Sequence, residues 1–390
     1  MDTNLTHPVL LPDGLVLRRS TRQDAERLAD FNGRIHGSTT GDDAPPQALA
    51  DWTYDLFDPH HPTFGEGDFT LVEDPANDKI VSCLCLINQT WAYGGIPFGV
   101  GRPELVGTDE HYRNRGLIRR QFEVVHAWSA QRDQPVQIIT GIPNYYRQFG
   151  YEMAPDLGGG VNVGENLLRK LRPEQSEPFR IRLAGADDVA LVMQAYAQLE
   201  RREPLVCVRD ADLWRYEILG KRPLNVNRTE IYIIETPEQT PVGALGIPAE
   251  LWGNVQGLSF IELLPGVSYL EVMPAVLRWL WAIGQQHSTP AMRCTVLSLR
   301  LGAEHPAYVA LDAHTAPRLR RYAYYTRVAD IPAFLRLIRP VLEQRLAASP
   351  CAGHSGEMVI TFYRSGVRIK LEKGRISAIE PHLAVWSDST

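Results

Sequence analysis

The sequence lacks the features that would place a protein in a membrane or on nucleic acid. None of its apolar runs approaches the roughly 20 residues that a membrane-spanning helix needs. The N-terminal stretch MDTNLTHPVLLPDGLVLRRS has no basic segment followed by an apolar run, so we expect no secretory signal. The 40 Lys+Arg against 46 Asp+Glu give a net charge of −6, which speaks against general nucleic-acid binding because that binding depends on neutralising phosphates. We therefore expect neither a membrane nor a nucleic-acid partner.

Cysteine is also scarce, with five residues scattered through the chain. Cys83 and Cys85 lie two apart in IVSCLCLI, so on a strand both side chains point to one face. A C-x-C pair can hold a metal, but no other Cys/His pair stands near it at ligand spacing. We interpret the two cysteines as small core residues, predict no metal site, and expect a reduced, cytoplasmic protein.

Length and composition indicate several ordinary globular domains. At 390 residues the chain suits roughly two or three domains, and 44% hydrophobic with 22% charged residues lets them bury proper cores. The pattern begins with a strand at 15–19, a helix ended by Gly37, and strands in FTLVED, KIVSCLCLIN and PELVGT. A helix from about Leu117, a buried strand in PVQIITG and a short helix in PNYYRQFGY follow. This order of elements predicts a mixed α/β fold.

The pattern restarts near Phe179. VLRRSTRQDA (16–25) and RIRLAGADDV (180–189) can be written over each other, and a helix follows in both. The alignment pairs Leu17 with Ile181, Arg18 with Arg182 and Asp24 with Asp188. Later, the helix YLEVMPAVLRWLWAIGQQ and the strand AMRCTVLSL parallel helix 117–130 and strand 136–141, but LLPGVSYLEVM replaces TDEHYRNRGLI. We interpret this as a fold duplication in which one copy has lost a loop.

A different pattern closes the chain. IPAFLRLIRPVLEQRLA is amphipathic, and GEMVITFYRSGVRIKLEKGRISAI alternates apolar and polar residues between the turns RSG and EKG. These patterns predict one helix and a sheet of three antiparallel strands. We therefore divide the chain into a first domain at 1–155, a connecting segment at 156–178, a second domain at 179–328 and a third at 329–390.

The stretch HYRNRGLIRRQF (111–122) gathers positive charge around one glycine, where a strand passes into a helix. The first N–H groups of a helix have no partner within it and carry partial positive charge, so this position favours an anion. Gly116 lets the backbone approach a ligand closely, and several N–H groups in a row suit a pyrophosphate. Arginines at the rim add charge: Arg113, Arg115, Arg119 and Arg120. The stretch is neither G-x-x-x-x-G-K-[ST] nor G-x-G-x-x-G, and the alternative of a solvated helix face accounts for Arg119 and Arg120 only.

These residues carry a resemblance to a known family. VGTDEHYRNRGLI resembles the acyl-CoA-binding motif of the GCN5-related N-acetyltransferases (GNAT), whose core is [QR]-x-x-G-x-[GA]. Arg113 and Gly116 match it, while Ile118 departs from it as in the R-x-R-G-L-[LI] of the subfamily around the mycobacterial enhanced-intracellular-survival protein. YYRQFGYEMA matches that subfamily's Y-x-R-F-G-Y in part. The resemblance implies an α/β (α+β) chain of two tandem GNAT-like domains followed by a sterol-carrier-protein-like α+β domain.

The activity that the resemblance implies is that of an acetyl-CoA-dependent N-acetyltransferase, with acetyl-CoA as cosubstrate. A primary amine (aminoglycoside-like, a lysine side chain or another small amine) attacks the thioester directly in a ternary complex. The strand backbone at Val106, Gly107 and Thr108, where the strand would splay from its neighbour, would pair with the pantetheine arm. The pyrophosphate would be held at the motif itself: Arg113, Asn114, Arg115, Gly116, Leu117 and Ile118.

Two residues receive catalytic roles from the resemblance. Tyr146 corresponds to the general acid of the family's Y-x-x-F-G-Y motif, and a phenol that loses its proton only near pH 10 suits donation to a thiolate. The alternative is a tyrosine that only packs. Glu104 is the candidate base, because many family members use a strand-borne glutamate that acts through water, and His111 is the weaker candidate. The third domain is shorter than the module it resembles, so we transfer no catalytic role to the carboxylate of Thr390.

The substrate is the least defined part. Residues 51–69 mix aromatic and acidic side chains, among which Trp52, Asp55 and Phe57 are candidates for binding a cationic amine. An ordinary helix and loop with a solvated acidic face explains the same composition. The alternative function is an acyl-CoA or lipid-binding protein with vestigial catalytic activity, and the subfamily leads us to expect a homo-oligomer.

Overall fold

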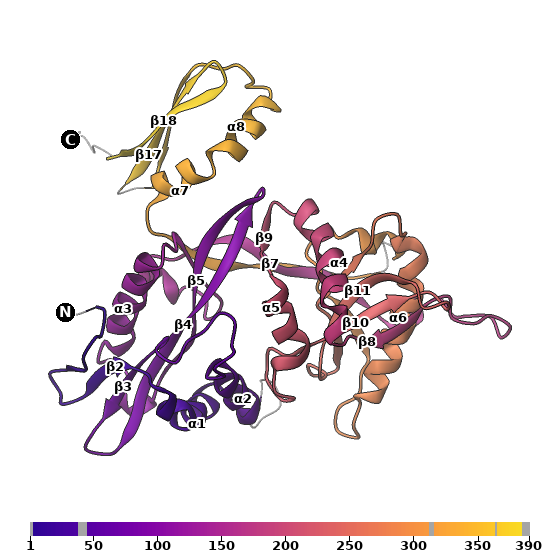
Figure 1. Ribbon diagram of the computed structural model, residues 1–390, viewed down its shortest axis with the longest axis horizontal. Coiled ribbons are helices and arrows are strands. Elements are labelled where there is room, and N and C mark those ends of the chain that lie inside the picture. The colour runs from indigo at the N-terminus through magenta and orange to yellow at the C-terminus, as the bar shows by residue number, and fades with distance from the viewer. Residues whose placement is uncertain (1–2, 38–44, 312–315, 363–364, 384–390) are drawn as a thin grey trace.

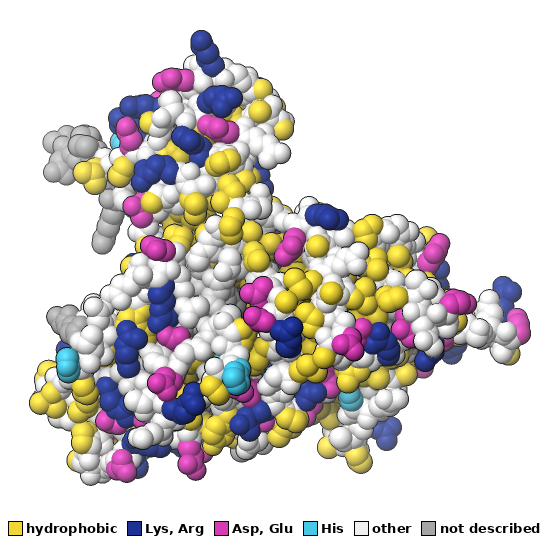
Figure 2. All heavy atoms as spheres, viewed as in Figure 1, with side chains coloured by type: hydrophobic (Ala, Val, Ile, Leu, Met, Phe, Trp, Pro, Cys, Tyr) yellow, Lys and Arg dark blue, Asp and Glu magenta, His cyan; other side chains and the backbone are white. Residues whose placement is uncertain are grey.

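The computed structural model describes residues 3–37, 45–311, 316–362 and 365–383, so Thr390 lies outside the described part. Figure 1 shows an indigo-to-purple N-terminal half, a magenta-to-orange second half beside it, and a yellow C-terminal part above them. Strands and helices alternate through both halves, so the predicted α/β class is confirmed. On the face shown in Figure 2, basic and acidic side chains are mixed over the surface.

The first half is a sheet between two layers of helices. Its antiparallel strands are β1 (Val9–Leu10), β2 (Val16–Arg19), β3 (Phe69–Asp74), β4 (Lys79–Tyr93) and β5 (Ile96–Thr108), and β6 (Val136–Ile139) runs parallel to β5. Helices α1 (Ala25–His36) and α2 (Pro46–Leu56) pack on one face, and α3 (Leu117–Gln131) packs on the other. The predicted helix ended by Gly37 and the predicted helix from Leu117 are confirmed.

Side chains alternate along β4 as these two layers require. Cys83 and Cys85 belong to the core beneath α1 and α2, whereas Leu84 and Leu86 belong to the core that contains Trp128 of α3. Both cysteines are fully buried free thiols, and burial raises the pKa of each. The interpretation of the pair as small core residues on one face is confirmed.

The second half repeats this plan. Strands β8 (Arg180–Leu183), β10 (Thr229–Glu235), β11 (Pro241–Pro248) and β13 (Phe260–Leu263) form an antiparallel sheet, and β12 (Val255–Leu258) runs parallel to β14 (Val296–Leu299). The helices are α4 (Val189–Arg202), α5 (Ala211–Arg215), a π-helical turn at Tyr216–Gly220, and α6 (Tyr269–Gln286). The last of these has the bounds that its sequence predicts. Strand β9 (Leu205–Cys207) pairs with β4 of the first half.

The aligned arginines of the two halves make the same contacts. Arg18 donates hydrogen bonds of 2.8–3.0 Å to Asp24 and Glu73. Arg182 donates hydrogen bonds of 2.8–3.1 Å to Asp188 and Glu235. Arg18 thereby ties β2, and Arg182 ties β8, to the start of the following helix and to the neighbouring strand. These contacts support the predicted duplication.

Two long strands join the halves into one 11-stranded sheet. β7 (Glu152–Val163) leaves the first half to pair with β14, and β15 (Arg318–Val328) returns to pair with both β7 and β6. The expected connecting segment 156–178 therefore contributes residues 156–163 to a strand. Its glycines have a packing reason, because a Cβ on Gly160 would lie 1.9 Å from the carbonyl oxygen of Leu299. The domain boundaries stay predictions, since the sheet continues through them.

The C-terminal part packs on the tip of the β4–β5 hairpin. Helices α7 (Ile331–Leu337) and α8 (Arg339–Ala347) precede three antiparallel strands, β16 (Gly356–Thr361), β17 (Gly366–Glu372) and β18 (Arg375–His382). The three strands are confirmed, but the single expected helix is two, broken at Ile338 because Pro340 has no N–H to continue the first helix. Phe334 packs edge-on against Phe98, with ring centroids 5.2 Å apart. The likeness of this part to a sterol-carrier module stays a prediction.

Short helical turns complete the described chain. They lie at Arg22–Asp24, Glu110–Tyr112, Tyr146–Phe149, Glu165–Leu167, Ala186–Asp188 and Pro306–Ala310. The third of these is the short helix expected in PNYYRQFGY. Within the described ranges, no helix is both long and apolar enough to cross a membrane.

Candidate active site

The turn before α3 leaves a glycine open to its surroundings. Gly116 caps the helix in a left-handed conformation, with φ of +71°. Apart from its chain neighbours, no described atom lies within 4 Å of a Cβ built on it. Asn114 is also left-handed, with φ of 63°, so the backbone turns sharply twice before the helix begins. Residues 113–116 are exposed, Leu117 is buried and Ile118 is half-buried, so the first N–H groups of α3 face an open space of the kind that binds anions.

The loop that carries this turn is anchored on both sides. Arg34 of α1 donates to Asp109 at 2.8 Å, where the loop leaves β5. Tyr112 donates to Asp74 at the end of β3, with an oxygen–oxygen distance of 2.7 Å. The hydrogen bonds from Arg34 and from the His111 N–H outweigh burial and lower the pKa of Asp109, although burial alone raises it. The turn is therefore held in place before any ligand binds.

The arginines of this region divide into two groups. Arg113 and Arg115 are exposed at the turn itself, where Arg115 pairs with Asp13 at 3.3 Å. Arg119 instead donates to Gln148 at 3.0 Å and so binds α3 to the helical turn at 146–149. The solvated-face interpretation therefore does not describe Arg119 fully, because this side chain has a definite partner.

Strand β5 separates from β6 on its way to this loop. Among the described residues, the parallel pairing of the two strands is limited to Val100 and Gly101 of β5, so the expected separation at 106–108 is confirmed. A bulge also interrupts the pairing of β5 with β4. Cys85 faces Glu104 but Cys83 faces Gly107, which leaves one extra residue in β5, and Leu105 has φ of +53°. Bulges next to open strand edges re-aim backbone and side chains toward a site.

Tyr146 lies in a cluster of aromatic rings. It is 6% exposed and packs edge-on against Phe122 and Tyr145, and its hydroxyl has no hydrogen-bond partner within the described ranges. Burial raises the pKa of Tyr146 well above that of an ordinary phenol, and the negative charge of Glu104 raises it further. The phenol therefore keeps its proton throughout the neutral range, as a proton donor must.

A residue from the far end of the second half completes this cluster. Tyr325 of β15 is fully buried, and its ring centroid lies 5.5 Å from that of Tyr146. Its hydroxyl accepts a hydrogen bond of 2.5 Å from the Asn144 N–H, which is 181 positions away in the chain. Sequence reasoning misses Tyr325 because only the pairing of β15 with β6 brings it here. No local pattern carries that information.

Glu104 is held by a neighbour on the same strand. Arg102 Nε donates to Glu104 Oε1 at 2.7 Å, and the two side chains are 27% and 12% exposed. Burial works against the charge of Arg102, but Glu104 and Tyr324 outweigh it and raise the pKa of the guanidinium. Arg102 was missed in the sequence, although its i, i+2 spacing in RPEL places it on the same face of the strand as Glu104. His111, the weaker candidate base, is an exposed loop residue.

The structure does not bring the three candidate substrate residues together. Trp52 lines a cavity, whereas Phe57 is buried and stacks on Phe69 with ring centroids 5.6 Å apart. Asp55 is buried against the second half, where it accepts hydrogen bonds from the Arg222 N–H at 2.9 Å and the Asn225 side chain at 2.7 Å. Its carboxylate therefore fastens α2 to the second half.

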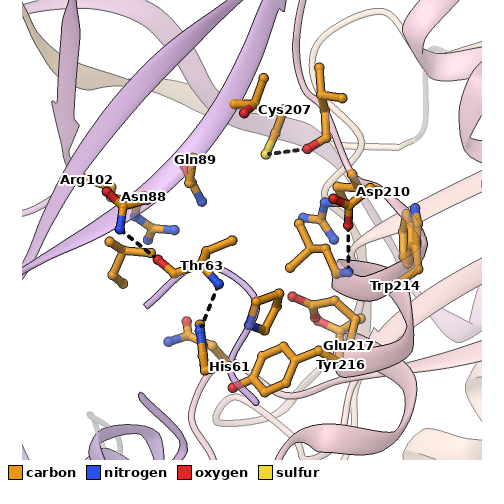
Figure 3. Close-up of a pocket in the computed structure, with 18 of the residues that line it drawn as sticks. His61, Thr63, Asn88, Gln89, Arg102, Cys207, Asp210, Trp214, Tyr216 and Glu217 are labelled. Carbon is orange, nitrogen blue, oxygen red and sulfur yellow. Dashed lines mark hydrogen bonds between the residues drawn. The ribbon is translucent and has the colours of Figure 1, made fainter. Parts of the chain in front are cut away.

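The cavity lies between the two halves and has a volume of about 940 Å³. Figure 3 shows Arg102 of β5, Cys207 of β9 and Trp214 of α5 around it, so each half contributes walls. Arg102 connects it to Glu104 through their hydrogen bond. Of the described candidates from the sequence, Trp52 alone lines it.

Comparisons with known proteins agree with this geometry. Residues 18–154 match the family model described as an acetyltransferase (GNAT) domain. A GCN5-related N-acetyltransferase from Kribbella flavida is 17% identical, covering 96% of this chain and 84% of its own, with a TM-score of 0.58. A second one, from Anabaena variabilis ATCC 29413, is 13% identical, covering 94% and 85%, with a TM-score of 0.59. Eis1 from Mycobacterium abscessus is 13% identical, covering 93% and 84%, with a TM-score of 0.54.

The structural likenesses extend beyond the part that the family model matches. They cover at least 93% of this chain in the three structures named, and at such low identities they show a shared fold. No curated protein sequence matches the chain.

Proposed function

We propose that this chain, whose residues 18–154 match the GNAT acetyltransferase domain model, transfers an acetyl group from acetyl-CoA to a primary amine. The amine nitrogen attacks the thioester carbonyl while both substrates are bound, the carbon–sulfur bond breaks, and coenzyme A leaves as a thiol. In such a reaction the protein holds the two reactants together, removes one proton from the amine and supplies one to the sulfur.

The observation that carries the proposal is the open edge of β5 leading into the left-handed turn at Gly116. Backbone groups of Val106, Gly107 and Thr108 are free of β6 and suit pairing with the amide-rich pantetheine arm. The residues of the turn would hold the pyrophosphate: Arg113, Asn114, Arg115, Gly116, Leu117 and Ile118. The backbone N–H groups supply most of the contacts, because the space above Gly116 is open and the exposed guanidinium groups stand beside it.

Two side chains handle the protons in this proposal. Tyr146 donates its phenolic proton to the departing thiolate, and its raised pKa ensures that the group carries this proton at neutral pH. Glu104 accepts a proton from the amine through a water molecule, and Arg102 orients its carboxylate from 2.7 Å. The charge of Glu104 acts on Tyr146, which supports assigning both to one site.

A thiol-release assay with acetyl-CoA and a panel of primary amines tests the proposal, together with the melting temperature measured with and without acetyl-CoA. We expect acetyl-CoA to raise the melting temperature and at least one amine to release thiol. Stabilisation without thiol release from any amine would instead favour the alternative of an acyl-CoA-binding protein with vestigial activity. The absence of both effects contradicts the proposal. Size-exclusion chromatography with light scattering tests the expected homo-oligomer.

A further inference from the structure

The cavity between the halves is lined by more cations than carboxylates. Arg102, Arg132, Arg209 and Lys221 line it, against Asp210 and Glu217. This balance is opposite to the acidic wall expected for a cationic amine. What matters is which of these groups still have hydrogen-bond donors that no protein group uses, because those donors are what they can offer an anion.

Most of the charges around the cavity are engaged within the protein. Lys221 pairs with Glu217 at 2.6 Å, and the Asp210 carboxylate accepts the Leu213 N–H at the start of α5 at 2.9 Å. Arg132 pairs with Asp68 and donates to Asn88 at 2.9 Å. These groups fix the cavity walls.

Arg209 is different. It lines the cavity directly after β9, yet it forms no ion pair within 4 Å in the described ranges, and its Nε is buried without a hydrogen-bond partner. Its guanidinium lies over the rings of Trp214 and Tyr196, 5.1 and 5.7 Å from their centroids. Burial works against its charge, but Glu217, Tyr196 and Cys207 outweigh it and raise the pKa of the group, so Arg209 is a cation at every working pH.

Arg102 lines the same cavity as Arg209 and also has donors to spare. Both guanidinium groups act on the thiol of Cys207, where they oppose the raising of its pKa by burial. Figure 3 shows Arg102 and Cys207 on the cavity wall. Within the described ranges only the Nε of Arg102 is hydrogen-bonded, to Glu104, although a guanidinium has five N–H donors. The cavity therefore offers two guanidinium groups, one of them bonded to the proposed base.

We propose that this cavity binds the anionic group, a carboxylate or a phosphate, of the amine that is acetylated, with Arg209 and Arg102 as its ligands. The inference rests on the proposed function and narrows its substrate to an amine that also carries an oxyanion. Paired N–H donors of arginine match the geometry of both anions. Arg102 connects the place where the amine would lose its proton with the place where the anion would bind, because it donates to Glu104 and also lines the cavity.

The first test compares amines that differ only in the anion. Lysine is measured against 1,5-diaminopentane, and phosphoethanolamine against ethanolamine, in the thiol-release assay. We expect the anion-bearing member of one pair to have the lower KM, and the pair in which this occurs distinguishes carboxylate from phosphate. In Arg209→Met, the KM of that substrate should rise about 10- to 100-fold with little change in its kcat, and the KM of the amine without the anion should change little. Equal KM values within both pairs would overturn the proposal.

Arg215→Met is the matched control. Arg215 lies on α5, six residues beyond Arg209, and is exposed and paired with Asp212 at 2.7 Å. Removing its charge should leave the KM of every amine unchanged. An equal KM rise in both variants would assign the effect to the overall charge of the surface and overturn the role of Arg209.

The second test needs no turnover. In the Gly116→Glu background, which removes the proposed pyrophosphate site, inorganic phosphate and acetate are added at constant ionic strength and the melting temperature is followed. We expect one of the two anions to raise it, and Arg209→Met to remove this rise. Without anions, Arg209→Met should melt at nearly the same temperature, because the half-buried Arg209 has no ion pair to lose in the described ranges.

These outcomes separate the two proposals. A lower melting temperature of Arg209→Met with an unchanged response to both anions would mean that Arg209 only supports the fold, and would overturn the inference. If no amine releases thiol but the anion response depends on Arg209, the anion site stands and the proposed function fails. If amines are acetylated without preference for an oxyanion, the function stands and the site fails.

Discussion

The two halves of this chain carry the same frame of strands. The corresponding arginines, Arg18 and Arg182, allow the two sheets to be compared strand by strand, through the residues that face one another on neighbouring strands. The steps in the first half are Arg18, Leu71, Cys83 and Gly107, and in the second half they are Arg182, Ile233, Ala244 and Glu262. Each half thus reaches its fourth strand by the same route, and the positions of Gly107 and Glu262 correspond.

At that fourth strand the halves differ. The β4–β5 pairing contains the bulge at Leu105, whereas the β11–β13 pairing is regular over its four residue pairs. Gly107 has no side chain, while Glu262 is 1% exposed and bonded to Arg202 at 2.6 Å, to Tyr269 at 3.1 Å and to His305 at 3.3 Å. The hydrogen bonds from His305 and Arg202 outweigh burial and lower the pKa of Glu262. In the second half a carboxylate of the chain itself takes this position, whereas in the first half Ile35 and His36 of α1 lie 2.9 and 3.0 Å from a Cβ built on Gly107 and leave room for a glycine only.

This difference separates what the fold needs from what the chemistry needs. The arginine clamp, the strand order and the two helix layers recur in both halves, so they belong to stability. The bulge at Leu105 occurs in the first half, and there the left-handed glycine, Gly116, caps its helix directly, whereas Gly266 lies two residues before the cap of α6, Ser268. The two halves therefore share the frame and differ at the bulge and at the start of the helix.

The largest expected effect comes from putting a side chain at each of two left-handed glycines. Gly116 (φ +71°) precedes α3, Gly266 (φ +87°) precedes α6, and neither has a described atom near a built Cβ apart from chain neighbours. Both Gly→Glu variants carry a similar backbone strain of about 1–2 kcal/mol. Only Gly116→Glu should lose the acetyl-CoA-dependent rise in melting temperature and all measurable thiol release. If Gly266→Glu also lost the rise in melting temperature and the thiol release, acetyl-CoA binding could not be assigned to the first half alone.

A smaller effect, on turnover alone, is expected from removing one hydroxyl. Tyr146→Phe should lower kcat about 10²- to 10³-fold at little change in melting temperature, because its hydroxyl has no partner in the described structure and serves the leaving thiolate. Tyr269→Phe is the matched variant of the second half, where the hydroxyl donates to Glu262. It should lower the melting temperature and leave kcat unchanged. Full turnover in Tyr146→Phe would disprove the acid assignment while leaving the family intact.

The arginine clamps allow a comparison of stability. Arg18 is 18% exposed and Arg182 is 43% exposed. Arg18→Met should reduce the free energy of unfolding by about 3 kcal/mol because it strands two shielded carboxylates, and Arg182→Met by about 1–2 kcal/mol because water reaches that cluster. Urea unfolding followed by fluorescence measures both. Equal losses would show that the two clamps do not differ in their shielding.

A further effect, which appears only as the pH falls, concerns acid sensitivity. In the first half, burial and then the charge of Arg327 lower the pKa of His126 to about 3, and His126 bonds to the Tyr151 hydroxyl at 2.9 Å. The unfolded chain takes up this proton near pH 6.5, so the stability is present above that pH and falls as pH drops toward 3. The slope is at most about 1.4 kcal/mol per pH unit. His126→Gln should flatten the loss of melting temperature between pH 6.5 and 4, and the exposed His111→Gln should not.

Local patterns were enough to predict the elements that depend on neighbours in the chain. Helix α6 has its predicted bounds, the helix at Leu117 begins after its glycine, and Cys83 and Cys85 share a core. The arginine–aspartate spacing in 18–24 and 182–188 predicted the repeat, because each arginine bonds a residue six positions away.

What the sequence could not predict depends on distant pairing. The glycines at 158–160 read as a linker because small residues serve flexibility and close packing equally well. Asp55 read as a substrate contact because its partners Arg222 and Asn225 lie more than 160 residues away. Tyr325 and Arg209 could not be predicted for the same reason. Each is brought to its site by a strand of the second half that pairs with a strand of the first half, β15 with β6 and β9 with β4.

The pairing of β15 with β6 means that the first half cannot finish folding until β15 has been synthesised. A ribosome makes the turn at Gly116 more than 200 residues before Tyr325, which follows only after most of the second half has been made. Until then the nascent first half exposes the edge of β6 and lacks the ring that packs on Tyr146. Such a long-range strand closes late, because loop closure must come before its contacts stabilise anything. In the proposed mechanism, acetyl transfer therefore needs β15 to be made and paired, and until then the edge of β6 lacks this partner strand.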